Sequence, residues 1–238
     1  HRVTMILSRE NLTCIAGIFL LGLASCRNVP QLSHSPNAIS QPTTESTPSE
    51  NIAESNLETK PEDPETVAVS EDDIWSQLRQ ADTHYYVLMR HAIAPGTGDP
   101  PNFQLGDCST QRNLSEAGIT QARRTGDAFR AQMVAVQQVL SSEWCRCLDT
   151  ATAMDLGPVE PFPALNSFFE NRAKEPEQTQ MLREFMITHQ DKRGVTVLVT
   201  HFVNIIAIAD SGASSGEIVV MQVNGQNEPE VVAQIEPF

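Results

Sequence analysis

The chain has few basic side chains for its length. It carries 16 Lys and Arg against 30 Asp and Glu, a formal net charge of −14. Non-specific binding to nucleic acid depends on Lys and Arg that neutralise phosphates, so this balance argues against that class of function. From residue 83 onward the count is 11 against 18, so this part is also acidic, at −7. Any anion site must therefore be a local cationic cluster on a repelling background.

The apolar run near the start is too short to be a comfortable membrane span. It covers residues 14–24 and follows Arg2 and Arg9, whereas a spanning helix needs about 20 apolar residues. A charged start, a short apolar segment and small residues are typical of an export signal. Leu23-Ala24-Ser25-Cys26 comes next and resembles a bacterial lipobox, which implies lipidation of Cys26. A plain secretory signal and an uncleaved anchor are the alternatives to this signal over residues 1–26.

Residues 27–70 lack the features of a folded segment. Residues 27–69 contain no glycine, no periodic apolar pattern and six prolines. Ten carboxylates between Glu45 and Asp73 face a single lysine, Lys60. Low hydrophobicity with charge of one sign cannot offset the entropy of ordering, so we expect a disordered, self-repelling tether. Residues 71–238 are predicted to form the folded domain, and no internal repeat is visible.

Five cysteines are present, and two of them lie in the predicted signal, at Cys14 and Cys26. An exported domain would hold Cys108, Cys145 and Cys147 in an oxidising compartment, where disulfides form. We expect Cys108 to pair with one of the other two, which leaves one free thiol. A three-cysteine metal site is the alternative, but no fourth ligand lies nearby in the sequence.

After residue 70, segments that favour helices alternate with segments that favour strands. Ser115 is a good N-cap for a helix to about residue 133, and further helices are predicted over residues 72–78, 145–153 and 176–189. Strands are predicted over residues 85–91, 138–141, 159–162 and 195–201, with a closing hairpin of residues 218–223 and 231–235 around Asn224-Gly225. This order indicates a three-layer α/β/α sandwich with a mostly parallel central sheet.

Two of the predicted strands end in a histidine. Residues 85–91 end in Arg90 and His91, and residues 195–201 end in His201. Both runs are apolar and rich in β-branched or aromatic residues, which is typical of fully buried parallel strands. Ligands of open α/β sheets bind beyond the carboxyl ends of the strands. We therefore expect both imidazoles and the arginine at one edge, a combination that suits an anion.

A second arginine is expected at the same edge. The strand over residues 138–141 leads into a helix that places Arg146 at its start, where guanidinium and free backbone amides can hold a phosphate. Two arginines and two histidines could surround a tetrahedral dianion, and an imidazole in the right tautomer could accept its phosphoryl group. A metal site on His91 and His201 is the alternative, but Arg90 and Arg146 would oppose a dication.

Four motifs in this order resemble those of the histidine phosphatase (phosphoglycerate mutase-like) superfamily. Arg90-His91-Ala92 is similar to the Arg-His-Gly signature, and residues 114–122 are similar to the Leu-Thr-x-x-Gly-x-x-Gln-Ala helix. The second-arginine segment and the late strand-histidine of the family are matched by Ser141-Ser142, Arg146, Thr150-Ala151 and Thr200-His201. The set spans nearly the whole domain.

The resemblance implies roles for individual residues, with no metal or cofactor. His91 would be the residue phosphorylated, while Arg90, Arg146 and His201 would bind the phosphate. Thr97 stands where many members carry an asparagine of the phosphate pocket. Asn204, three residues after His201, is also expected to face the site.

The general acid is the weak point of the resemblance. Phosphoglycerate mutases carry Leu-Asn-Glu before the acid loop, whereas this chain reads Leu165-Asn166-Ser167. A serine hydroxyl cannot act as a general acid at neutral pH. Glu170, three residues on, is therefore the candidate acid, and Glu143 is the other carboxylate near a motif.

The sequence as a whole predicts a periplasmic, membrane-tethered phosphatase for a small phosphorylated substrate. A mutase is disfavoured because the phosphoglycerate pool is cytoplasmic and this chain is predicted to be exported. A phosphate- or phospho-ligand-binding lipoprotein with little or no turnover is the alternative, because Ser167 stands at the acid position.

Overall fold

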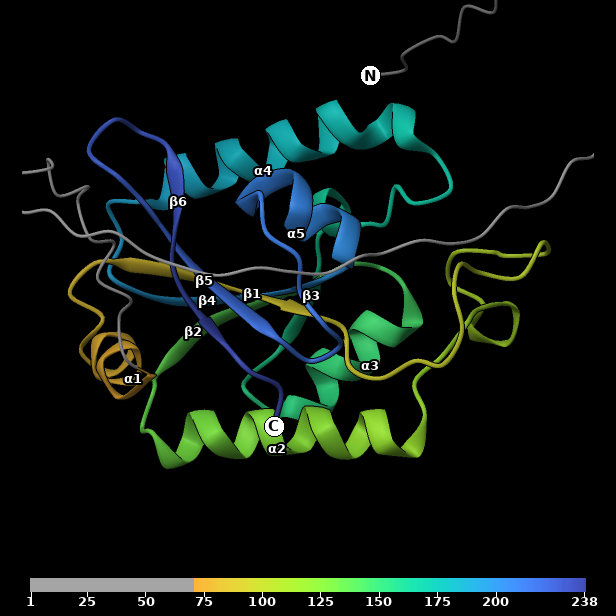
Figure 1. Cartoon of the computed structure of the whole chain (residues 1–238), viewed down its shortest axis with the longest axis horizontal. Helices are drawn as coiled ribbons and strands as arrows, with labels where there is room; N and C mark the ends of the chain where they lie inside the picture. Colours follow the sequence, from red (N-terminus) through yellow and green to blue (C-terminus); the bar gives the residue numbers. More distant parts are fainter. Residues whose placement is uncertain (1–70) are drawn as a thin grey trace, which may run out of the picture. The chain divides into compact units, whose positions relative to one another are not determined.

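A computed structural model describes residues 71–238 (Figure 1). The predicted signal and tether, and with them Cys26, lie outside the described residues. Six strands are formed: β1 (His84–Arg90), β2 (Val136–Ser141), β3 (Val159–Pro161), β4 (Gly194–Thr200), β5 (Ile218–Val223) and β6 (Pro229–Ile235). The helices are α1 (Glu71–Gln80), α2 (Glu116–Ala131), α3 (Cys145–Met154), α4 (Glu175–His189) and α5 (Phe202–Ala209). Three short 3₁₀ helices cover Cys108–Thr110, Pro163–Leu165 and Arg172–Lys174.

The strands form one sheet in the order β3-β2-β4-β1-β5-β6. The first four are parallel, while β5 is antiparallel to β1 and β6 to β5. The predicted mostly parallel sheet and its closing hairpin are thereby confirmed. In the central pair, Arg90 of β1 lies opposite Thr200 of β4. His91 and His201 therefore leave the sheet side by side.

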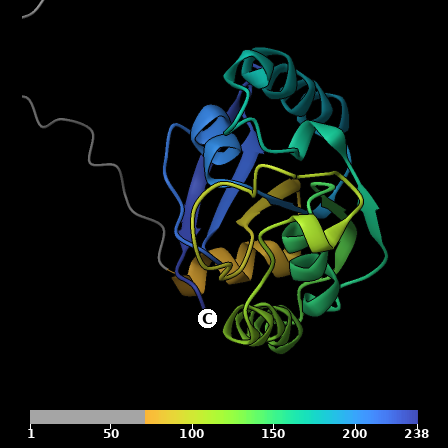
Figure 2. The same ribbon diagram turned by 90° about the vertical axis from the view of Figure 1, so that its right-hand side faces the viewer.

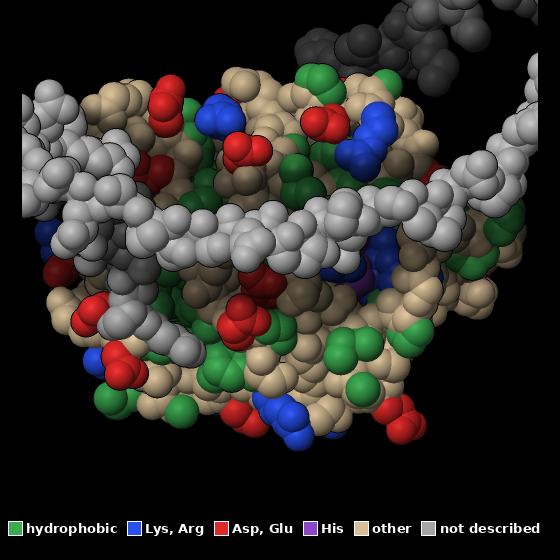
Figure 3. Space-filling model, viewed as in Figure 1, with side chains coloured by type: hydrophobic (Ala, Val, Ile, Leu, Met, Phe, Trp, Pro, Cys, Tyr) green, Lys and Arg blue, Asp and Glu red, His purple; other side chains and the backbone are tan. Residues whose placement is uncertain are grey.

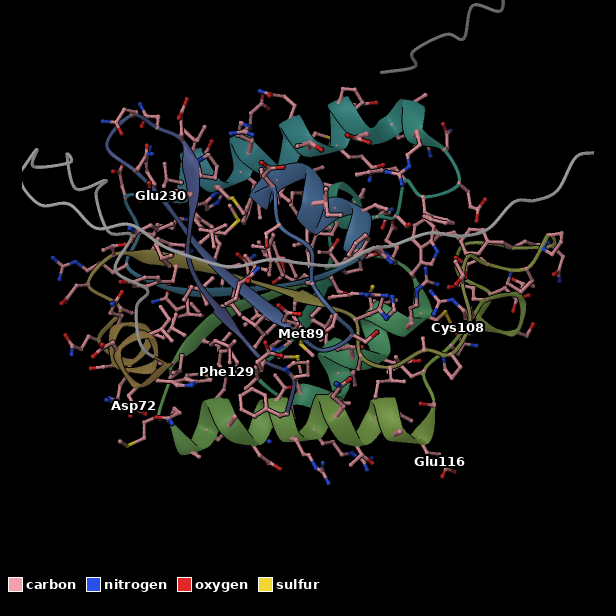
Figure 4. The ribbon with its side chains drawn as sticks, viewed as in Figure 1. Asp72, Met89, Cys108, Glu116, Phe129 and Glu230 are labelled. Atoms are coloured by element: carbon pink, nitrogen blue, oxygen red, sulfur yellow. A yellow bond between two sulfur atoms is a disulfide. The ribbon has the colours of Figure 1, made fainter. Side chains whose placement is uncertain are left out.

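Helices cover both faces of the sheet, which gives the predicted three layers (Figure 1). Alternate residues of β1 pack on opposite faces. Val87 and Met89 belong to the core formed with α1, α2 and α3, whereas Tyr86 and Leu88 belong to the core formed with α4 and α5. Phe129 points from α2 towards the sheet (Figure 4). Burial on both faces is why these strands read as continuous apolar runs.

The helix boundaries agree with the sequence in most places. Ser115 caps α2 as predicted, and its hydroxyl accepts a hydrogen bond from the Gly118 amide at 3.1 Å. Helix α5 was not predicted, because Phe202–Ala209 is apolar almost all round and shows no amphipathic period. Within residues 71–238, no helix has the length and apolar content that crossing a membrane requires.

Helices α2 and α3 are in close contact. A Cβ on Gly126 of α2 would lie 1.9 Å from the carbonyl oxygen of Met154 in α3. Only a residue without a side chain fits here, so Gly126 sets how near α2 comes to the helix that begins at Cys145.

A long segment, residues 91–115, joins β1 to α2 and crosses the carboxyl edge of the sheet (Figure 2, yellow). A disulfide ties this segment to the start of α3 by joining Cys108 to Cys145. Figure 4 shows Cys108 at this edge. The prediction that Cys108 pairs with one of two cysteines is confirmed, and Cys147 is the free, buried thiol.

Candidate active site

A cavity of about 610 Å³ opens at the carboxyl edge of the parallel strands. It receives side chains from the ends of β1 and β4, from the start of α3 and from two loops. The predicted site residues that line it are Arg90, His91, Thr97, Arg146, Glu170 and His201. The fold therefore brings together the two strand-end histidines and both predicted arginines.

The imidazole of His91 is 2% exposed and held in one tautomer. Its Nδ1 lies 2.8 Å from the carbonyl oxygen of Ala92. A carbonyl only accepts hydrogen bonds, so Nδ1 carries the hydrogen and Nε2 keeps its lone pair. Burial lowers the pKa of His91 to about 3, and the charge of Arg146 adds to this effect. The ring is therefore neutral at pH 7, with a nucleophilic nitrogen available.

His201 lies next to His91, with ring centroids 5.5 Å apart. Its Nε2 is 2.8 Å from Ser142 Oγ, and its Nδ1 is 3.4 Å from Arg146 Nη2. A guanidinium only donates, so Nδ1 is the acceptor and Nε2–H donates to Ser142. Burial, followed by the charge of Arg146, lowers the pKa of His201 well below its usual value. A phosphate dianion in the cavity would favour protonation of Nδ1, which could then donate to it.

Three arginines line the cavity, one more than predicted. Arg112 is the addition, and its guanidinium donates to the carbonyl oxygens of Ala94 and Gly98. Arg90 donates to the Ala213 carbonyl at 2.9 Å. Burial, with the charge of Arg146 next, lowers the pKa of both Arg90 and Arg112. Lys and Arg side chains gather beside histidine atoms on this side of the surface (Figure 3). These three arginines form a local cationic cluster, which is what an anion site in this acidic chain would need.

Asp99 accepts four hydrogen bonds in the site, and no sequence pattern identified it. Its carboxylate accepts from both terminal nitrogens of Arg146, at 2.8 and 3.2 Å. It also accepts from the Arg112 amide at 3.1 Å and from the Trp144 indole at 3.0 Å. Burial alone would raise the pKa of Asp99, but hydrogen bonds and the charge of Arg146 make the net shift downward. Asp99 is thus held ionised and is not free to deliver a proton.

The two candidate acids have different surroundings. Glu170 lines the cavity and faces the loop opposite, where a Cβ on Gly98 would lie 2.9 Å from its Oε1. Glu143 is not among the lining residues, and its carboxylate accepts a hydrogen bond from Asn166 Nδ2 at 2.7 Å. Ser167 also lines the cavity, as the acid-loop comparison suggested. Glu170 is therefore the free carboxylate at the cavity.

The prediction that Asn204 faces the site needs correction. Asn204 is buried but does not line the cavity, and its Nδ2 donates to the Asn166 carbonyl at 2.9 Å. The reason is α5, which starts directly after His201 and carries Asn204 back over the loop that contains Asn166. Asn204 therefore supports this loop.

Trp144 also forms part of the cavity wall, and no role in the site was predicted for it from the sequence. Its position one residue before Cys145, close to Arg146, is the signal that could have identified it. No such signal exists for Asp99 or Arg112, which lie in a segment without periodic pattern.

The structure leaves no place for a three-cysteine metal site. Cys108 and Cys145 are joined in a disulfide, so the three-cysteine site is wrong. Within the described part of the chain, no group of three or more His, Cys, Asp or Glu side chains could hold a metal ion.

Comparison with known proteins gives matches in structure alone. No family model matches the sequence, and no curated protein matches it. The open reading frame Rv3214 from Mycobacterium tuberculosis matches with a TM-score of 0.50 and 14% identity, over 65% of this chain and 98% of that one. The protein histidine phosphatase SixA, complexed with tungstate, has a TM-score of 0.46 and 14% identity, over 64% and 96%. Phosphoserine phosphatase from Entamoeba histolytica has a TM-score of 0.47 and 14% identity, over 63% and 96%.

The strands and helices of the structure confirm the predicted fold class. Its α/β fold, built on a mostly parallel six-stranded sheet, is similar to that of Rv3214. At these identities the likeness concerns the fold, and the activity has to be argued from the site itself.

Proposed function

We propose that this protein hydrolyses phosphomonoesters through a phosphohistidine formed on His91, without a metal. The observation that carries the proposal is the state of the His91 ring: Nδ1 is committed to the Ala92 carbonyl, so Nε2 is free to attack. Arg90, Arg112 and Arg146 line the same cavity and can neutralise phosphate oxygens. The names of the neighbouring structures, which include several phosphatases, agree with this activity.

In the first step, the lone pair of His91 Nε2 forms a bond to phosphorus while the bond between phosphorus and the leaving oxygen breaks. Glu170, in its protonated form, gives its proton to that oxygen. Arg90, Arg146 and protonated His201 bind the phosphoryl oxygens, with Thr97 at the edge of the pocket. The alcohol then departs and the phosphoryl group remains on His91.

In the second step, a water molecule attacks the phosphorus of phosphohistidine. The phosphorus–nitrogen bond breaks, its electron pair returns to Nε2, and the Glu170 carboxylate takes a proton from the water. Orthophosphate leaves, and His91 and Glu170 regain their starting states. Asp99 takes part in neither step and instead fixes the orientation of Arg146.

We also propose that the protein is exported and anchored to the periplasmic side of a membrane by a lipid on Cys26. The short apolar run and the tetrapeptide ending in Cys26 support this location. Fractionation of cells that express the wild type and a Cys26→Ser variant tests it. We expect the wild type in the membrane fraction and the variant outside it, and the same distribution for both would overturn the proposal.

Turnover of p-nitrophenyl phosphate by the full chain tests the proposed reaction. His91→Ala should abolish turnover, and Glu170→Gln should reduce it without abolishing it. His189→Ala and Glu177→Gln are matched controls, because neither residue lines the cavity, and both should leave the rate unchanged. Mass spectrometry of the quenched wild type should show one phosphoryl group on His91.

Two outcomes would contradict the proposal in different ways. Turnover that survives His91→Ala would exclude the phosphohistidine intermediate. A wild type without turnover that inorganic phosphate still protects from thermal unfolding would favour the alternative, a phosphate- or phospho-ligand-binding lipoprotein.

A further inference from the structure

Beyond the phosphate-binding groups, the cavity has an aromatic wall. The ring of His201 meets the indole of Trp144 edge to face, with centroids 5.5 Å apart. The indole in turn stacks on Phe103, with centroids 5.0 Å apart and an angle of 21° between the planes. A line of rings therefore leads from the His91–His201 pair outward to the loop that crosses the sheet edge.

Two further aromatic rings lie at the mouth of the cavity. Phe169 is 45% exposed and Phe202 is 41% exposed, and both line the cavity. Arg172 lies over the Phe169 ring at 5.9 Å, and Arg90 lies over Phe202 at 5.3 Å. Exposed apolar side chains grouped around a hollow and bordered by charges are typical of a ligand site. Four of the twelve aromatic residues in the described part of the chain lie at this cavity.

The wall formed by Trp144 and Phe103 is held in place before any ligand arrives. The Trp144 indole donates to Asp99, whose carboxylate also holds Arg146. The disulfide joins Cys145, the residue after Trp144, to Cys108 in the loop that carries Phe103. A preorganised surface loses little conformational freedom on binding, so its contacts add directly to affinity.

The cavity is also larger than a phosphate requires. A volume of about 610 Å³ falls within the range of sites that hold drug-sized ligands. The space beyond the phosphate-binding side chains is bounded by Phe103, Trp144 and Phe169, together with Pro100 and Pro101. This part of the cavity suits a flat apolar group joined to the phosphate.

The ease with which the leaving group departs also favours an aromatic substrate. A phenol has a pKa of about 10, whereas water and aliphatic alcohols are much weaker acids. A phenolate therefore leaves with much less help from an acid. In this chain Ser167 stands at the acid position and Glu170 is exposed, so an aryl leaving group places the smallest demand on the site.

We propose that the cavity selects phosphate monoesters of aromatic alcohols, with the aryl ring packed between the Trp144–Phe103 wall and Phe169. The proposal rests on the proposed phosphatase function and names its substrate class. The phosphate lies against His91 and the arginines, and the ring lies outside it against the aromatic side chains.

Binding of phosphonates that cannot be hydrolysed tests this selectivity independently of turnover. Calorimetry with the full chain would give the dissociation constants of phenylphosphonate and methylphosphonate. An aromatic contact of ordinary strength predicts that phenylphosphonate binds about three- to tenfold more tightly. In Phe169→Ala and Phe103→Ala this ratio should fall towards one, while methylphosphonate binding stays unchanged.

Leu105→Ala is the matched control, because Leu105 is an exposed apolar residue of the same segment that does not line the cavity. Its ratio should equal that of the wild type. Equal affinities for the two phosphonates, or a ratio that survives Phe169→Ala and Phe103→Ala, would overturn the aryl proposal. Selective binding without turnover of phenyl phosphate would instead retain aryl recognition and reject the phosphatase function.

Discussion

Both carboxylate oxygens of Asp99 accept hydrogen bonds from the guanidinium of Arg146, at 2.8 and 3.2 Å. The side chains are 9% and 3% exposed, so the pair is shielded from water. The same carboxylate holds the indole of Trp144 and the amide of Arg112. One side chain from the loop after β1 thus fixes the cation at the start of α3 and the aromatic wall beside it.

Replacing Asp99 should destabilise the protein far more than replacing a surface partner. Asp99→Asn removes the charge opposite Arg146 and leaves a buried guanidinium uncompensated, so we expect a loss of about 3 kcal/mol. Asp127→Asn is the control, since Asp127 pairs with Arg130 on the exposed side of α2, and it should cost less than about 1 kcal/mol. Urea unfolding followed by circular dichroism measures both. Equal losses would show that the buried Asp99–Arg146 pair contributes no more to stability than the exposed Asp127–Arg130 pair.

Acidification should destabilise the fold through His91. Burial lowers its pKa to about 3, while an unfolded chain titrates near 6.5. Between these values the unfolded state binds a proton that the folded state does not, so stability falls as the pH falls below about 6.5. Well between the two pKa values, the loss from this group approaches about 1.4 kcal/mol for each pH unit.

Urea unfolding of the wild type and His91→Gln at pH values between about 5 and 8 measures this effect. The variant should lose less stability per pH unit, because Gln does not titrate. The pKa values of His84 and His201 are also lowered by burial, so part of the slope should persist in the variant. Identical slopes for the two proteins would argue against a neutral His91 in the fold.

The contact between α2 and α3 should not tolerate a methyl group at Gly126. Gly126→Ala would place Cβ 1.9 Å from a backbone oxygen of α3, which cannot rotate away. We expect a loss of at least about 3 kcal/mol, despite the higher helix propensity of alanine. Gly225→Ala, where nothing lies within 4 Å, should change stability by less than about 1 kcal/mol. Thermal unfolding scans measure the stability of both variants. A Gly126→Ala protein as stable as the wild type would refute the close contact between α2 and α3.

The disulfide should contribute measurably to stability. It closes a loop with a sequence separation of 37 residues, for which the chain-entropy model gives about 4 kcal/mol. Cys108→Ser combined with Cys145→Ser should lose an amount of this order in guanidinium unfolding. Added reductant should lower the stability of the wild type towards that of the double variant. Reductant that shifts both proteins equally would mean that the effect does not come from this bond.

The strand-end histidines could be predicted because their signal is local. An apolar run buried on both faces identifies each strand, and the first polar residues after it must lie at the sheet edge. The same holds for Arg146, which starts a helix directly after a strand. The Cys108 pairing was narrowed to two partners by the count of cysteines, but only the fold could choose Cys145.

Asp99 and Arg112 could not be predicted because they act through contacts distant in sequence. They lie in a segment whose path depends on the disulfide and on the position of α3, not on a repeating pattern. The prediction that Asn204 faces the cavity was wrong for a related reason. An apolar octapeptide has no periodicity to reveal α5, and without that helix the direction of Asn204 could not be inferred.

The shape of the cavity mouth could be changed, by evolution or by design, independently of the two histidines and two of the three arginines. The imidazoles and two of the arginines stand on strand ends and on α3, while Pro100, Pro101 and Phe103 stand on the segment between β1 and α2. Randomising residues 100–103 while keeping Asp99 and Cys108 would diversify the shape of the cavity mouth without replacing the side chains proposed to bind phosphate. Residues 100–103 are thus the exchangeable part of this segment, whereas His91, Asp99 and Cys108 anchor the rest of it by hydrogen bonds and a disulfide.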